Sequence, residues 1–177
     1  MWKTSDGGKT WLQLTDRSDL TRLACVSVHP HLPDVVVACI GEPDVAPTHV
    51  GLIYSADGGR HWDFIGPADG LSSSFYRAIF HPQDPNIIYA ASEKGVYLTK
   101  DRGAHWGLIL SFPGNNPNSW DQIPDLVMKP DDPSVLIAAQ MNLGIFRTLD
   151  GGATWGRVDQ GMDTTTKTIQ PRIIKGT

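Results

Sequence analysis

The segment TSDGGKTW at residues 4–11 returns as SADGGRHW at 55–62, as TKDRGAHW at 99–106 and as TLDGGATW at 148–155. The aspartates stand at 6, 57, 101 and 150, so the copies are 51, 44 and 49 residues apart. Each aspartate precedes its tryptophan by five residues, while the sequence between copies varies in length. A fixed local motif at a period of this size predicts a repeat protein whose unit is one supersecondary element.

Further elements of the repeat lie upstream of three of the four copies. A proline follows His29, His81 and Lys129, and a second proline follows three residues later. Next come an apolar run (35–40, 87–91, 135–139) and a glycine-led run (51–54, 95–98, 144–147). Such short β-branched and aromatic runs between Pro and Gly turns predict four strands per unit. No segment carries an apolar period of 3.6 residues over three turns. The sequence therefore predicts an all-β fold of antiparallel four-stranded β-propeller blades, whose repeats span ~40–50 residues.

The composition excludes several classes of protein. The 177 residues carry a net charge of −4, which disfavours a nucleic-acid-binding protein, because such proteins have a basic face. No apolar run reaches the ~18 residues that a membrane-spanning helix needs, and the first residues lack a signal-peptide pattern. Two cysteines, Cys25 and Cys39, are too few for a disulfide framework or a four-thiolate zinc site. We expect no membrane insertion, nucleic acid, cofactor or metal.

Structural roles account for the residues of the repeated segment. Each aspartate can accept hydrogen bonds from backbone N–H groups of its own turn. The second glycine of the segment is expected to need a positive φ, whereas Arg102 replaces the first glycine of the third copy and suggests a less constrained position. The tryptophan is expected to cover the hairpin. The residues assigned these roles are Asp6, Gly8, Trp11, Asp57, Gly59, Trp62, Asp101, Gly103, Trp106, Asp150, Gly152 and Trp155.

This pattern resembles the Asp-box, or BNR repeat, with the form Ser-x-Asp-x-Gly-x-Thr-Trp. The first and fourth copies fit, with Thr148 in the serine position, whereas His61 and His105 replace the threonine in the others. Proteins with such boxes include sialidases, xyloglucan-active glycosidases, the sortilin luminal domain and photosystem II assembly factors. All are propellers of differing function, so the resemblance implies a fold rather than an activity. It also suggests an extracytoplasmic location, which the sequence itself leaves unknown.

The repeats divide the chain into units with expected bounds. A partial blade covers 1–15, three blades cover about 22–65, 75–110 and 123–158, and a tail strand covers about 168–175. The tail strand and the first pair of strands can complete one blade together. Three arrangements remain open: a fragment of a larger ring with missing blades, a four-bladed ring, and closure by self-association.

Functional residues are expected on the long loops opposite the repeated turns. The longer loops on this face are 41–49, 67–74 and 111–121, and the loop at 41–49 far exceeds its counterparts near 92–94 and 140–143. Extra length on one face marks a binding surface. We expect this face to take a protein or carbohydrate ligand. The candidate ligand-binding residues are His49, Asp69, Tyr76, Arg77, Asn116 and Trp120.

A binding module without catalysis is the expected function, and a glycoside hydrolase or a fragment of one is the alternative. Hydrolysis of glycosides needs two carboxylates ~5–10 Å apart. The candidates are Glu42, Asp44, Asp121 and Asp125. The arginines of the first strands do not align by repeat position, which disfavours a sialidase. Counting across the first hairpin places Cys39 opposite about Ala24, so buried thiols are expected rather than a disulfide.

Overall fold

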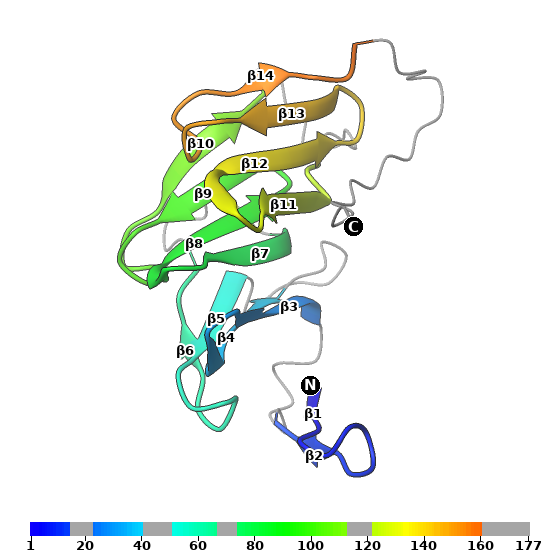
Figure 1. The fold of residues 1–177 in the computed structure, drawn as a ribbon, viewed down its shortest axis with the longest axis vertical. Coiled ribbons are helices and arrows are strands. Elements are labelled where there is room, and N and C mark those ends of the chain that lie inside the picture. Colours follow the sequence, from blue (N-terminus) through cyan, green and yellow to red (C-terminus); the bar gives the residue numbers. More distant parts are fainter. Residues whose placement is uncertain (15–22, 41–50, 67–73, 113–121, 161–177) are drawn as a thin grey trace.

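The computed structural model describes residues 1–14, 23–40, 51–66, 74–112 and 122–160 (Figure 1). These residues form strands and turns, with no helix among them. Accordingly, the described part of the chain contains no helix that could cross a membrane. The predicted all-β class is confirmed.

Three antiparallel four-stranded sheets make up most of the structure, each with its strands in chain order. We call them sheets II, III and IV. Sheet II holds β3 (Leu23–His29), β4 (Leu32–Ile40), β5 (Gly51–Ser55) and β6 (Asp63–Phe64). Sheet III holds β7 (Phe75–His81), β8 (Asp84–Ser92), β9 (Gly95–Thr99) and β10 (Gly107–Ser111). Sheet IV holds β11 (Asp125–Lys129), β12 (Asp132–Gln140), β13 (Gly144–Thr148) and β14 (Gly156–Arg157).

Sheet I is a hairpin of β1 (Trp2–Lys3) and β2 (Leu12–Gln13), which correspond to the third and fourth strands of the other sheets. The second strand of each complete sheet begins earlier than expected. Instead of following the second proline it includes it, at Pro33, Pro85 and Pro133. Each proline is the second residue of its strand, near the end, where a missing N–H is tolerated.

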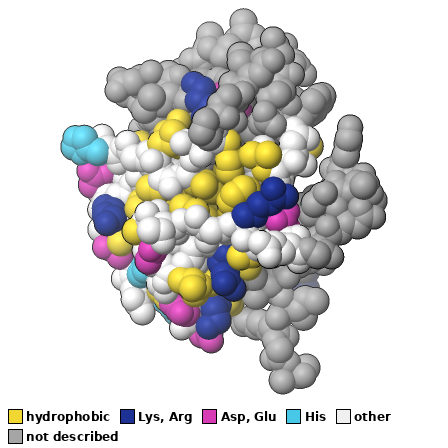
Figure 2. Space-filling model, turned by 90° about the horizontal axis from the view of Figure 1, so that it is seen from above, with side chains coloured by type: hydrophobic (Ala, Val, Ile, Leu, Met, Phe, Trp, Pro, Cys, Tyr) yellow, Lys and Arg dark blue, Asp and Glu magenta, His cyan; other side chains and the backbone are white. Residues whose placement is uncertain are grey.

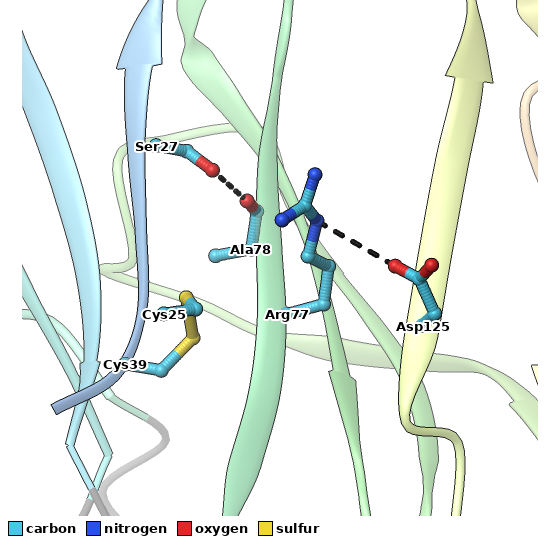
Figure 3. Close-up of a disulfide and its surroundings, with 6 residues drawn as sticks. All are labelled: Cys25, Ser27, Cys39, Arg77, Ala78 and Asp125. Carbon is cyan, nitrogen blue, oxygen red and sulfur yellow. Dashed lines mark hydrogen bonds and ion pairs between the residues drawn. A yellow bond between two sulfur atoms is a disulfide. The ribbon is translucent and has the colours of Figure 1, made fainter. Parts of the chain in front are cut away.

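The core lies between successive sheets, which stack face to face along the molecule (Figure 1). One cluster joins sheets II and III, with Val37, Leu52 and Ile65 against Phe80 and Tyr97. A second cluster joins sheets III and IV in the same way, and a smaller one includes Met1 and sheet II. The first strands of neighbouring sheets also lie side by side, because Ser27 Oγ donates a hydrogen bond of 2.5 Å to the Ala78 carbonyl (Figure 3). Each sheet therefore depends on the next for its buried face.

The expectation of two buried thiols is wrong, because Cys25 and Cys39 form a disulfide (Figure 3). A register shift between Val28 and His29, next to the hairpin turn, places Val28 opposite Val36, and the pairing then runs unbroken to Cys25 opposite Cys39. Their Cα atoms are 4.9 Å apart, within the usual range for a disulfide. The register change that the sequence count called for is supplied by extra residues of β4 at this shift.

Candidate functional site

The four repeated segments form turns of one geometry, which we number turn 1 (4–11), turn 2 (55–62), turn 3 (99–106) and turn 4 (148–155). In turn 4, Asp150 Oδ1 accepts hydrogen bonds from the Thr148 hydroxyl and the Thr154 N–H, at 2.6 and 2.9 Å. The Thr154 hydroxyl donates to Oδ2 at 2.6 Å, and the Gly152 N–H donates to Thr148 Oγ1 at 2.9 Å. In turns 2 and 3, His61 and His105 place Nδ1 where the threonine hydroxyl stands. The polar side chains of the turn are thus engaged within it.

Left-handed backbone is needed at both glycine positions of the turn. The second glycine has φ between 87 and 96° in all four turns. Arg102, in the first position of turn 3, also has a positive φ of 58°, so that position is constrained as well. The value falls in the small left-handed region that other residues can enter at a cost. Its guanidinium donates to Asn86 Oδ1 and lies 5.2 Å from the Tyr54 ring centroid in the preceding sheet.

Hydrogen bonding lowers the pKa of every turn aspartate. In turn 1, hydrogen bonds from the Thr10 hydroxyl and N–H lower the pKa of Asp6 to about 2. The pKa of Asp101 falls to about 2, chiefly through the N–H and ring of His105, and the pKa of Asp57 is lowered in the same way by His61. For Asp150 the hydroxyls of Thr148 and Thr154 lower the pKa to about 2. These carboxylates are held ionised as acceptors, a structural role that disfavours proton transfer by them.

Each turn except the first packs against the preceding sheet. A Cβ built on the second glycine of turns 2, 3 and 4 would meet the side chain that stands three residues after the preceding tryptophan. In turn 3 the Trp106 Nε1 also donates to the Ile65 carbonyl at 2.7 Å. Among the described residues, only Trp11 lies within 4 Å of the corresponding point on Gly8. The packed pairs are Gly59 with Leu14, Gly103 with Ile65 and Gly152 with Ile109.

A shallow groove of about 570 Å³ follows the contact between turn 3 and sheet II. Its lining includes Phe64, Asn86, Lys100 and Arg102. Neither Tyr76 nor Arg77, the two candidate ligand-binding residues that the structure describes, lines it, because it lies on the rim with the repeated turns. Since its arginine is already engaged by Asn86 and Tyr54, the groove is best explained as part of the contact between sheets.

Three candidate residues, Tyr76, Arg77 and Asp125, lie at the opposite rim, where the first strand of each sheet begins. We call it the loop rim. A β-bulge between Phe75 and Arg77 leaves Tyr76 without a direct partner on β8, and such bulges redirect side chains. Arg77 Nε lies 3.7 Å from Asp125 Oδ1 at the start of β11, so the ion pair crosses from sheet III to sheet IV (Figure 3). The Arg77 side chain is 42% exposed and that of Asp125 is 25% exposed.

The electrostatics of the loop rim favour hydrogen bonding over proton transfer. Burial, followed by the nearby charge of Glu93, raises the pKa of Tyr76 to about 12, so its phenol stays protonated at neutral pH. Arg77 Nε makes no hydrogen bond in the described part of the chain, although Asp125 is close enough for an ion pair. A partly exposed ion pair of this kind contributes little to stability, ~1 kcal/mol or less. Because the two side chains are partly exposed, they can also make hydrogen bonds to a ligand with hydroxyl groups.

The remaining candidates lie outside the described residues. The candidate carboxylates Glu42, Asp44 and Asp121 do so, as do the candidate ligand-binding residues His49, Asp69, Asn116 and Trp120. The expected tail strand at 168–175 does as well. Sequence analysis assigned no role to Glu93, whose backbone N–H donates to the Ser74 carbonyl at this rim. The sequence signal that could have identified Glu93 is its position in the turn that follows the apolar run 87–91. The described residues hold no cluster of three potential metal ligands.

Comparison with known sequences gives a weak relationship to xyloglucanases. No family model matches the chain. Xyloglucanase Xgh74A of Acetivibrio thermocellus is 26% identical over 186 residues, and its counterpart from strain ATCC 27405 is 25% identical. Each match covers 85% of this chain and 22% of the relative. The chain thus spans about a fifth of the length of these relatives.

Solved structures with the same fold include two GH74 enzymes. The GH74 xyloglucanase from Xanthomonas campestris has a TM-score of 0.73 at 17% identity, over 92% of this chain and 27% of that one. The Niastella koreensis GH74 enzyme has a TM-score of 0.70 at 13% identity, over 90% and 26%. YCF48 from Cyanidioschyzon merolae has a TM-score of 0.53 at 15% identity, over 76% and 36%. At these identities the likeness shows the fold alone, and it is that of a partial β-propeller.

Proposed function

We propose that this chain is a β-propeller segment that binds carbohydrate at its loop rim, with a xyloglucan-type β-glucan as the ligand. The sequence match to xyloglucanase Xgh74A across 85% of the chain is the observation that carries the proposal. We further propose that turns 1 to 4 are Asp-box turns, because each aspartate accepts hydrogen bonds within its own turn. The Cys25–Cys39 disulfide supports an oxidising, extracytoplasmic setting.

The loop rim supplies groups suited to a sugar. The partly exposed Arg77 guanidinium can donate hydrogen bonds and the partly exposed Asp125 carboxylate can accept them, while the Tyr76 hydroxyl is buried. Because Arg77 and Asp125 come from different sheets, a ligand held by both would bridge two blades. Sugar hydroxyls can both donate and accept, so such a mixed set of partners fits them.

Calorimetric titration of the chain with xyloglucan oligosaccharides tests the proposal. The variants Arg77→Ala and Asp125→Asn should each weaken binding by about tenfold or more, since a hydrogen bond to a charged group contributes ~1.5–3 kcal/mol. Arg60→Ala, on the opposite rim in turn 2, is the matched control and should bind like the parent chain. Absence of binding to any soluble glucan would overturn the carbohydrate proposal and favour a protein ligand.

Glycoside hydrolysis is the second candidate function, because the matched relatives are xyloglucanases. In this case Asp125 would be one carboxylate of the pair that the reaction needs. Release of reducing ends from xyloglucan, abolished by Asp125→Asn, would support hydrolysis. Binding without release of reducing ends would support the binding module.

A further inference from the structure

A buried histidine lies in the contact between sheets II and III, at the last residue of β3. His29 is 3% exposed, and its ring meets the Phe80 ring of sheet III edge-on, with 5.4 Å between the ring centroids. Phe80 belongs to the core cluster that joins the two sheets. The side chains of His61 and His105 are instead 90% exposed, and Figure 2 shows exposed histidine side chains at one edge of the molecule. The burial of His29 therefore calls for its own explanation.

The hydrogen bonding of His29 suits the neutral imidazole. Its Nδ1 accepts a hydrogen bond of 3.3 Å from the backbone N–H of His31, so this nitrogen carries no proton. The proton of the neutral ring therefore lies on Nε2, which is buried and makes no hydrogen bond with any described residue. A second proton, on Nδ1, would face the N–H of His31 and break this hydrogen bond. The charged ring would also be buried beside Phe80, and burying a charge costs free energy unless it is paired and hydrogen-bonded.

The titratable groups around His29 do not compensate for its burial. Among the described residues, His31 faces it from its own turn, and His81 on β7 and Asp84 on β8 face it from sheet III. Burial lowers the pKa of His29 from its ordinary value of 6.5, and the charges of His31 and His81 act in the same direction. The backbone of His81 and the carboxylate of Asp84 oppose this shift of the pKa without reversing it. The folded chain thus keeps His29 neutral to a lower pH than the unfolded chain does.

We propose that His29 makes the contact between sheets II and III sensitive to acid, so that the contact is firm while the ring is neutral and loosens when Nδ1 takes a proton. The Cys25–Cys39 disulfide holds β3 on β4, so the change falls on the contact with sheet III rather than on the pairing within sheet II. Because the folded chain binds fewer protons than the unfolded chain, the stability that neutral His29 contributes is present above about pH 6.5. It is lost as the pH falls through the pKa of His29 in the folded chain.

The repeat supplies a matched control at the same position of sheet III. His81 also precedes a proline, and its Nδ1 accepts a hydrogen bond of 3.3 Å from the backbone N–H of Gln83. Unlike His29, His81 is only half-buried. In sheet IV the position is held by Lys129, whose Nζ lies 3.2 Å from Asp131 Oδ1. A comparison of His29 with His81 therefore separates the effect of burial between sheets from that of the hydrogen bond in the turn.

Urea denaturation of the whole chain at about pH 7.5 and about pH 5.5 tests the proposal. At the lower pH an unfolded histidine is protonated about ten times as often as not, so one histidine kept neutral by folding raises the unfolding equilibrium constant by at most about tenfold. The increase on acidification should be about three- to tenfold larger for the parent chain than for His29→Asn, whose amide oxygen accepts the same hydrogen bond without titrating. His81→Asn should keep most of the parent response. Equal responses of the parent chain and His29→Asn would overturn the proposal.

Hydrogen exchange of the backbone amides locates the change within the fold. Comparison of the parent chain with His29→Asn at the same pH cancels the intrinsic pH dependence of exchange. At about pH 5.5 the parent chain should lose protection in β3 and β7 relative to the variant, while β12 and β13 of sheet IV keep theirs. If His29→Asn does not fold, His29→Phe takes its place, because it keeps a ring against Phe80 and does not titrate. An equal loss of protection in all three sheets, or a His29 ring that titrates at or above pH 6.5 in NMR spectra, would refute the proposal.

Discussion

At the scale of single residues, the turns depend on aspartates that are kept ionised. The pKa values of Asp101 and Asp150 fall to about 2, from an ordinary value of 3.8. The native state therefore binds fewer protons than the unfolded chain between these values. The resulting contribution to stability is complete above about pH 4 and is lost as the pH falls toward 2.

The double variant Asp101→Asn/Asp150→Asn should therefore lose stability less steeply in acid than the parent chain does. The urea midpoint, measured from neutral pH to about pH 2, checks this. Asp63→Asn, on β6 outside the turns, serves as the control and should keep the parent slope. An unchanged slope in the double variant would show that the turns are not the origin of the acid sensitivity.

Two glycines, Gly152 in turn 4 and Gly156 just after it, allow the effect of a left-handed backbone on stability to be measured. Gly152 has φ of 96°, and a Cβ there would lie 2.5 Å from Ile109 Cδ1. Gly156 has no positive φ and no atom within 4 Å of such a Cβ. Gly152→Ala should lower the free energy of unfolding by about 1–3 kcal/mol, whereas Gly156→Ala should change it little. Equal effects in chemical denaturation would contradict the assigned role of Gly152.

At the scale of the strand pair, the disulfide joins β3 to β4 across a 14-residue separation. A cross-link closing a loop of about 15 residues contributes about 3 kcal/mol by restricting the unfolded chain. Addition of a reductant should lower the free energy of unfolding by about that amount. The variant Cys25→Ser/Cys39→Ser should match the reduced parent and show no response to reductant. A parent chain indifferent to reductant would mean that the disulfide does not stabilise the fold.

The strands and turns were predictable from the sequence because their signals are local and repeat. Four copies of one turn fix where the chain reverses, and two prolines per unit mark where the second strand begins. The disulfide was not predictable in this way, because extra residues in β4 beside the hairpin turn change the register without changing the sequence pattern. Among the candidate site residues, Tyr76, Arg77 and Asp125 do come to one rim. The ion pair between Arg77 and Asp125 joins two sheets, and it could not be predicted because the residue type at this position of the repeat differs from sheet to sheet.

At the scale of the whole molecule, stability should follow the contacts between neighbouring sheets, as in other repeat proteins. Ile65 tests this directly, because it is 8% exposed, receives Gly103 of the next turn and accepts the hydrogen bond of Trp106. Val158 holds the same position in sheet IV, with no described residue of a following sheet against it.

Ile65→Ala should therefore lower the free energy of unfolding by about 2–5 kcal/mol, and Val158→Ala should change it by less than about 0.5 kcal/mol. Both variants are measured by chemical denaturation at one low protein concentration, where a contact between copies does not contribute. If the two truncations cost the same, position in the stack does not determine the energetic role of the residue after the turn. A large loss for Ile65→Ala alone would show that the same repeat position stabilises the chain only where another sheet covers it.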